Sequence, residues 1–101
     1  MVEGVTSSGF EYKVSPGIAY DAKFLRAAVK MRSETADASE RLAGTFEMID
    51  AVFLNNDSEI ERFMKHLAGK SPTGRTDVRM LVQETDEIVT AIQEADASVK
   101  K

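Results

Sequence analysis

Few residues of this sequence have side chains suited to catalysis or to metal binding. His66 is the single histidine and there is no cysteine, and no carboxylates flank His66 at the spacing of metal ligands. Glu84, Asp86 and Glu87 form an acidic group in which positions 84 and 87 share one helix face while 86 points elsewhere. We expect these carboxylates to be solvated, and His66 to lie partly exposed near a helix C-terminus. The sequence therefore predicts no catalytic residue, no metal site and no cofactor.

Basic residues suggest a different chemistry, the binding of phosphates. They gather around the end of one predicted helix and the start of the next, at Arg62, Lys65, Lys70, Arg75 and Arg79. The segment "GKSPTGR" lies among them, but it lacks the preceding strand and the earlier glycine of a phosphate-binding loop. Glu59, Glu61 and Asp77 dilute the positive charge, and no aromatic residues interleave with the cations. A small helical nucleic-acid-binding regulator remains an alternative interpretation.

Length and composition favour one domain over residues 1–101. The chain has 43% hydrophobic and 30% charged residues, which is typical of a globular protein with one modest core. Its net charge of −4 argues against a role dominated by binding duplex nucleic acid. There is no run of apolar residues long enough to span a membrane and no secretory signal. We expect a protein of the cytoplasm that does not bind membranes.

A short strand is predicted near the N-terminus, over residues 9–15. Phe10, Tyr12 and Val14 alternate with polar residues, and Pro16-Gly17 then ends the strand. Residues 1–8 are expected to be a loose N-terminus or the weak first arm of a hairpin. One strand leaves backbone groups unpaired, so it should pair with its own N-terminal arm, with another copy or with a partner.

Four helices are predicted after this strand, in a bundle over residues 20–95, followed by a frayed tail over 96–101. Their expected ranges are 20–32, 38–54, 59–68 and 77–95. Caps are predicted at Asp21, Asp37 and Ser58, and stops at Asn55-Asn56 and Gly69. The predicted apolar face of the first helix consists of Phe24, Leu25, Ala28 and Val29. That of the second helix includes Phe46, and that of the fourth includes Val78. The fold class is thus mainly α: a short N-terminal β-strand or hairpin followed by a bundle of about four helices.

The order of these features resembles the small tail assembly chaperones of long-tailed bacteriophages. The similarity covers about residues 9–92, in the stretches "GFEYKVSPGIAYDAKFLRAA", "LAGTFEMIDAVFL" followed by "NNDSEIERFMKHL", and "GRTDVRMLVQETDEIV". In that family a short G-x-x-Y/F strand leads through a turn into a helix headed by Asp and aromatic residues. Relatives often have Gly where this chain has Asn55-Asn56, and two acidic residues where it has Tyr20-Asp21.

The resemblance implies a non-enzymatic role in tail assembly. Such a protein binds the aggregation-prone tape-measure protein while tail-tube subunits polymerise around it. It would act in the cytoplasm of the infected bacterial host, would be absent from the mature virion, and would be the shorter of two forms, the longer made by ribosomal frameshifting. Another small phage structural protein, such as a head-tail connector, is a further alternative.

The candidate partner-binding surface combines the strand with apolar residues of the second and third helices. A groove lined by Phe, Met and Leu can receive amphipathic helices of varied sequence. The strand also allows self-association into a homo-oligomer. The residues expected to contact a partner are Phe10, Tyr12, Val14, Phe53, Phe63 and Met64.

Overall fold

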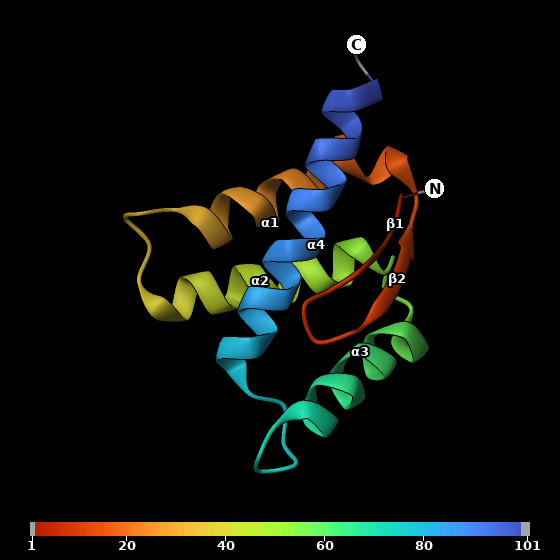
Figure 1. Cartoon of the computed structure of the whole chain (residues 1–101). Helices are drawn as coiled ribbons and strands as arrows, with labels where there is room; N and C mark the ends of the chain where they lie inside the picture. The colour runs from red at the N-terminus through yellow and green to blue at the C-terminus, as the bar shows by residue number, and fades with distance from the viewer. Residues whose placement is uncertain (1, 100–101) are drawn as a thin grey trace.

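A computed structural model describes residues 2–99 and shows an N-terminal hairpin packed on four helices (Figure 1). The fold class predicted from the sequence is confirmed. The hairpin lies against α4 and α3, while α1 and α2 form an antiparallel pair behind α4. None of the helices in the described part of the chain combines the length and apolarity needed to cross a membrane. The elements in chain order are β1 (Val2–Val5), β2 (Glu11–Val14), a 3₁₀ turn η1 (Pro16–Tyr20), α1 (Ala22–Arg32), α2 (Ala38–Val52), α3 (Asp57–Lys70) and α4 (Val78–Val99).

The strand is one arm of an antiparallel hairpin, with β1 as the other. The register pairs Val2 with Val14 and Gly4 with Tyr12. A Cβ atom at Gly4 would overlap the Tyr12 hydroxyl oxygen, so the glycine leaves room for this ring to cross β1. Of the two predictions for residues 1–8, a loose start or a hairpin arm, the structure shows the hairpin arm over Val2–Val5.

The helix starts follow local capping signals. The side chain of Asp21 accepts hydrogen bonds from the backbone N–H groups of Lys23 and Phe24, and Asp37 accepts one from Glu40, as predicted. The predicted cap of α3 at Ser58 is wrong. Asn56 caps this helix by accepting from the Glu59 N–H at 3.3 Å, and α3 therefore begins earlier, at Asp57.

Two predicted helix ends also differ from the structure. Gly69 does not stop α3, which continues to Lys70, and the backbone of Gly69 stays outside the left-handed region. Helix α4 continues to Val99 instead of ending at residue 95, and the end of the predicted frayed tail, residues 100–101, lies outside the described residues. Between α2 and α3 the left-handed residues are Leu54 and Asn55, with φ of 52° and 57°, whereas Asn55-Asn56 was predicted.

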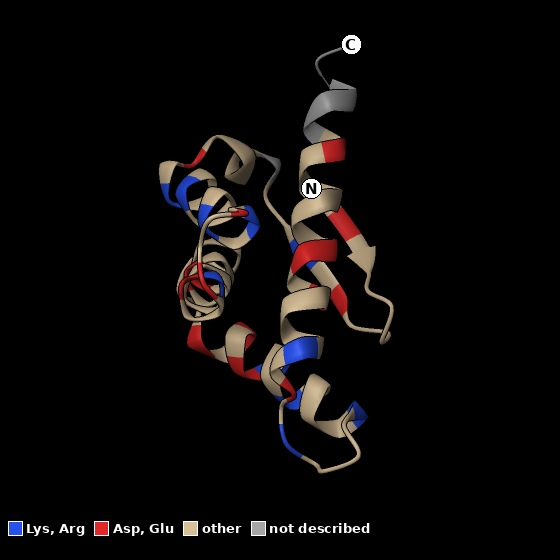
Figure 2. Cartoon of the chain, turned by 90° about the vertical axis from the view of Figure 1, so that its left-hand side faces the viewer, with Lys and Arg blue, Asp and Glu red and all other residues tan. Residues whose placement is uncertain are grey.

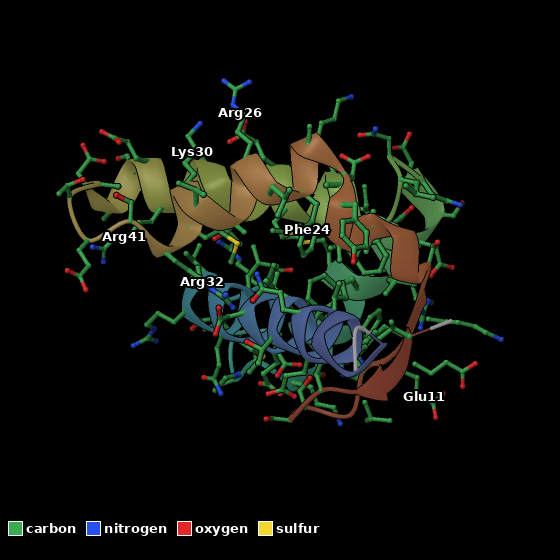
Figure 3. The ribbon with its side chains drawn as sticks, turned by 90° about the horizontal axis from the view of Figure 1, so that it is seen from above. Glu11, Phe24, Arg26, Lys30, Arg32 and Arg41 are labelled. Atoms are coloured by element: carbon green, nitrogen blue, oxygen red, sulfur yellow. The ribbon has the colours of Figure 1, made fainter. Side chains whose placement is uncertain are left out.

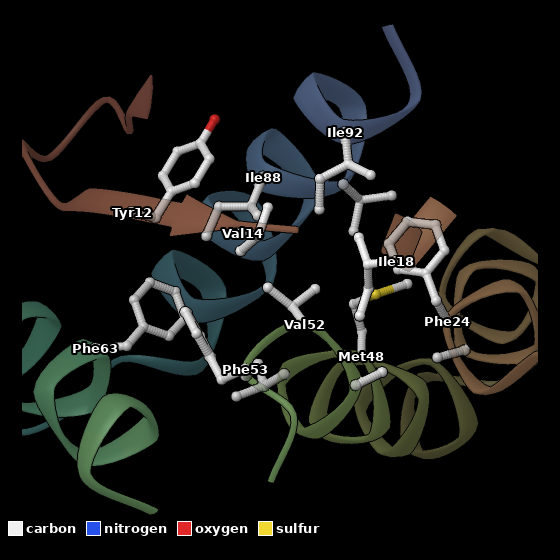
Figure 4. Close-up of a cluster of buried hydrophobic side chains, with 14 of the residues drawn as sticks. Tyr12, Val14, Ile18, Phe24, Met48, Val52, Phe53, Phe63, Ile88 and Ile92 are labelled. Atoms are coloured by element: carbon white, nitrogen blue, oxygen red, sulfur yellow. The ribbon is translucent and has the colours of Figure 1, made fainter. Parts of the chain in front are cut away.

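The core lies where β2, η1 and all four helices meet (Figure 4). Helices α1 and α2 approach closely because Gly44 faces Lys30 and Met31, where a Cβ atom would lie 2.9 Å from both the Lys30 Cβ and the Met31 backbone nitrogen. Of the predicted apolar face of α1, Phe24 and Ala28 are buried, together with Ala27, whereas Leu25 and Val29 are exposed. The largest fully buried hydrophobic side chains are Phe10, Phe24, Phe63, Met48, Ile49, Leu67, Leu81, Ile88 and Ile92.

The exposed side of the α1–α2 pair is charged (Figure 3). Arg26 and Lys30 point away from α4, and Lys30 forms an ion pair with Glu47 of α2 at 2.8 Å. Arg32 points the other way and joins α1 to α4 through Asp86, at 2.8 Å. These pairs are half-exposed, so each contributes no more than about 1 kcal/mol.

Candidate partner-binding surface

Five of the six residues predicted to contact a partner are buried in the core. Phe10, Phe53 and Phe63 form an aromatic cluster that joins β2 to α2 and α3, with ring centroids 4.8 Å apart between Phe10 and Phe63. Tyr12 and Val14 are buried beside them, and only Met64 is partly exposed. These side chains hold the hairpin on the bundle. The surface available to a partner must therefore consist of other residues.

The two strand residues Glu11 and Lys13 are exposed, in contrast to Tyr12 and Val14. The outer edge of β2, opposite β1, has no neighbouring strand among residues 2–99. The Arg62 guanidinium donates a hydrogen bond to the Glu11 carbonyl at 3.0 Å, lies 4.4 Å above the Phe10 ring and pairs with Glu59. A groove of about 610 Å³ lies here, lined by Glu3, Gly4, Val5, Glu11, Tyr12, Lys13, Glu59 and Arg62.

The turn between β1 and β2 is attached to α3 and α4 by a polar network. The Ser8 hydroxyl donates to the Glu84 carboxylate at 2.5 Å and lies 3.1 Å from His66 Nε2. The backbone N–H and the hydroxyl of Ser7 both donate to Glu87. Glu84 is thus only 2% exposed, and the prediction that this acidic group is solvated is wrong for Glu84.

The network assigns hydrogen-bonding roles to its members. His66 Nε2 also lies 3.2 Å from the Ser8 carbonyl oxygen, which can only accept, so this nitrogen carries the proton. Burial alone would raise the pKa of Glu84, but the hydrogen bonds that its carboxylate accepts from Ser8 and Thr6 outweigh burial and hold that pKa below its ordinary value.

This arrangement anchors the turn and does not activate Ser8. A serine nucleophile needs a neighbouring base that is free to accept its proton. The histidine nitrogen nearest to Ser8 is already protonated, and the Ser8 proton lies on the hydrogen bond to Glu84. No group of three or more residues that could bind a metal is found among residues 2–99.

Most cations of the predicted nucleic-acid patch are paired with acidic neighbours. Figure 2 shows that basic and acidic positions are interspersed along this part of the ribbon. Arg62 pairs with Glu59, Lys65 with Glu61 at 2.9 Å, and Arg79 with Asp77 at 3.2 Å. Lys70, at the end of α3, and Arg75, in the connection to α4, are exposed. Because three of the five charges are largely neutralised, the positive field that would attract phosphates is weak.

Large apolar side chains on the helices are exposed where the sequence predicted a core. Leu25 and Val29 lie one turn apart on α1 and are 47% and 72% exposed. Phe46 of α2 and Val78 of α4 are 43% and 48% exposed. We call Leu25 and Val29 the α1 ridge. Periodicity places these residues on an apolar face, but it does not show which part of that face the neighbouring helices cover.

Comparison with known proteins gives no match: no family model, no curated protein and no solved structure shows significant similarity to this chain.

Proposed function

We propose that this protein is a tail assembly chaperone of a long-tailed bacteriophage, a non-enzymatic protein that binds the tape-measure protein while tail-tube subunits polymerise. The α1 ridge carries the proposal. Leu25 and Val29 provide two aliphatic anchors at i and i+4, the spacing with which one amphipathic helix packs on another. The resemblance described above supplies the identity of the partner, and the site of action is the cytoplasm of the infected host.

The order of the local elements is consistent with that resemblance. A strand ending at Val14 leads through the η1 turn into a helix capped by Asp21, and three further helices follow. The Phe, Tyr and Val residues of the strand region contribute to folding, whereas the ridge is free to bind. The same helix therefore contacts the core with Phe24 and Ala28 and presents aliphatic side chains outward.

Co-purification tests the proposal. The full chain should co-purify with the tape-measure protein or the tail-tube subunit of the same phage. The double variant Leu25→Ser/Val29→Ser should lose at least about tenfold in affinity, because two apolar anchors are removed. Val78→Ser is the matched control, since it makes the same kind of change at a similarly exposed position of α4. If neither the tape-measure protein nor the tail-tube subunit binds, and both are shown to be folded and soluble, the proposal is wrong.

Two other classes of protein give different results in simple assays. A nucleic-acid-binding regulator would bind DNA or RNA with an affinity that falls steeply as salt rises. A head-tail connector would be retained in finished particles, whereas an assembly chaperone is absent from them. Arg62, Lys65 and Arg79 are already in ion pairs, which reduces the positive charge available to phosphates. We therefore expect neither nucleic-acid binding nor a steep dependence of binding on salt.

A further inference from the structure

The outer edge of β2 presents backbone groups that another strand could pair with. Alternate residues of an antiparallel strand direct their backbone N–H and C=O groups to the same side. The Glu11 carbonyl points away from β1, since it accepts from Arg62, and Lys13 lies two residues further along with the same orientation. Both side chains are exposed, and the groove described above runs along them.

We propose that this edge pairs with the same edge of a second copy of the chain, forming an antiparallel dimer centred on Tyr12. In this register Glu11 of each copy faces Lys13 of the other. Because the backbone groups of Glu11 and Lys13 point outward, each of these two Glu11–Lys13 pairs exchanges two N–H···O hydrogen bonds. The two hairpins become one four-stranded sheet. This inference concerns self-association and does not depend on the proposed function.

Charge complementarity singles out a second copy as the occupant. Glu11 and Lys13 lie on the same face of β2, so the dimer places opposite charges directly across from each other twice. Within one hairpin Lys13 already faces Glu3 in this way, and the two form an ion pair at 3.2 Å. Across the dimer, Glu3 and Lys13 of one copy would be followed by Glu11 of the second copy, so that the charges of neighbouring side chains alternate in sign.

Arg62 is compatible with this pairing. A carbonyl oxygen has two lone pairs, so the Glu11 oxygen can accept from Arg62 and from the N–H of Lys13 in the second copy. The paired segment is short, with two hydrogen-bonded residues in each strand, and such an interface buries less area than a stable dimer needs. We therefore expect a weak dimer, with a Kd between about 10 μM and 1 mM.

Charge reversal and restoration test the register. Glu11→Lys or Lys13→Glu alone places like charges opposite each other twice, and either change should weaken the dimer by about tenfold or more. The double variant Glu11→Lys/Lys13→Glu restores opposite charges and should recover most of the affinity. Glu34→Lys, in the connection between α1 and α2, is the matched control and should leave the dimer unchanged. Sedimentation equilibrium measures all four, and thermal unfolding checks that each variant is folded.

Disulfide trapping gives an independent measurement of register, because the natural chain has no cysteine. Hydrogen-bonded residues in antiparallel strands have Cα atoms about 5.5 Å apart, within the range that a disulfide spans. A mixture of Glu11→Cys and Lys13→Cys chains should form crosslinked heterodimers faster than either chain forms homodimers. A chain that stays monomeric at about 2 mM, or a dimer that Glu11→Lys leaves unchanged, would overturn the proposal.

Discussion

The close contact between α1 and α2 at Gly44 predicts that Gly44→Ala destabilises the protein, although a glycine-to-alanine change inside a helix usually stabilises one. Replacing glycine by alanine inside a helix normally stabilises a protein by up to about 1 kcal/mol. Here the new Cβ atom would lie 2.9 Å from the Lys30 Cβ and from the Met31 backbone nitrogen. The backbone of α1 cannot turn aside as a flexible side chain can, so the two helices must separate. Overpacking of this kind costs about 1–3 kcal/mol.

With the full gain in helix propensity subtracted, the expected result of Gly44→Ala is a net destabilisation of up to about 2 kcal/mol. For a domain of this size that corresponds to a fall in Tm of up to about 16 °C. Urea unfolding followed by far-UV circular dichroism measures it, with Gly69→Ala as the matched control. Gly69 also lies in a helix, but a Cβ atom there meets nothing within 4 Å, so this variant should be as stable as the natural chain or slightly more stable. If Gly44→Ala stabilises the protein as Gly69→Ala does, the close packing of α1 on α2 is not present in solution.

Three further predictions concern the hairpin and the surface. Glu84→Gln should cost about 1–3 kcal/mol at neutral pH. The pKa of Glu84 is held below its ordinary value in the folded protein, so its contribution is present above about pH 4.5 and is lost as the pH falls through the lowered pKa. The stability of the natural chain should therefore fall more steeply in acid than that of the variant, and parallel acid limbs in pH-dependent urea unfolding would contradict this reasoning. Phe63→Ala should cost about 3–5 kcal/mol in the same unfolding assay, because the ring is fully buried against Phe10 and Phe53. Replacing Lys30 and Glu47 together by Ala should change stability by less than about 1 kcal/mol, since their ion pair is half-exposed, and a larger loss would show that the pair has a structural role.

Features set by neighbouring residues could be predicted from the sequence. Asp21 and Asp37 cap their helices because a carboxylate two or three residues before free N–H groups satisfies them locally. The alternation of Phe10, Tyr12 and Val14 likewise indicates a strand with one buried face, which the structure shows. The Asn56 cap was missed because Ser58 and Glu61 offer an equally good local signal two residues later.

Features set by distant contacts could not be predicted. Leu25 and Val29 share the predicted apolar face of α1 with Phe24 and Ala28, but the neighbouring elements cover Phe24, Ala27 and Ala28 and leave the α1 ridge outside. Glu84 has the sequence environment of a solvated carboxylate, and its partner Ser8 is 76 residues away. A Ser-Ser pair in a turn and a helix full of acidic residues carry no local signal for this contact. The position of the candidate surface therefore emerged only with the tertiary structure.

The attachment of the hairpin turn also bears on the order of events during protein synthesis. Ser7 and Ser8 leave the ribosome before their partners Glu87 and Glu84, which lie 80 and 76 residues later. At about 5–20 residues per second, the hairpin waits roughly 4–15 s for α4 to be made. Until α2 and α3 have also been made, Phe10 lacks its contacts with Phe53 and Phe63, and an isolated two-stranded hairpin is at best marginally stable. Completion of this fold is therefore expected only after α4 has been synthesised, with docking of the hairpin as a late, long-range step.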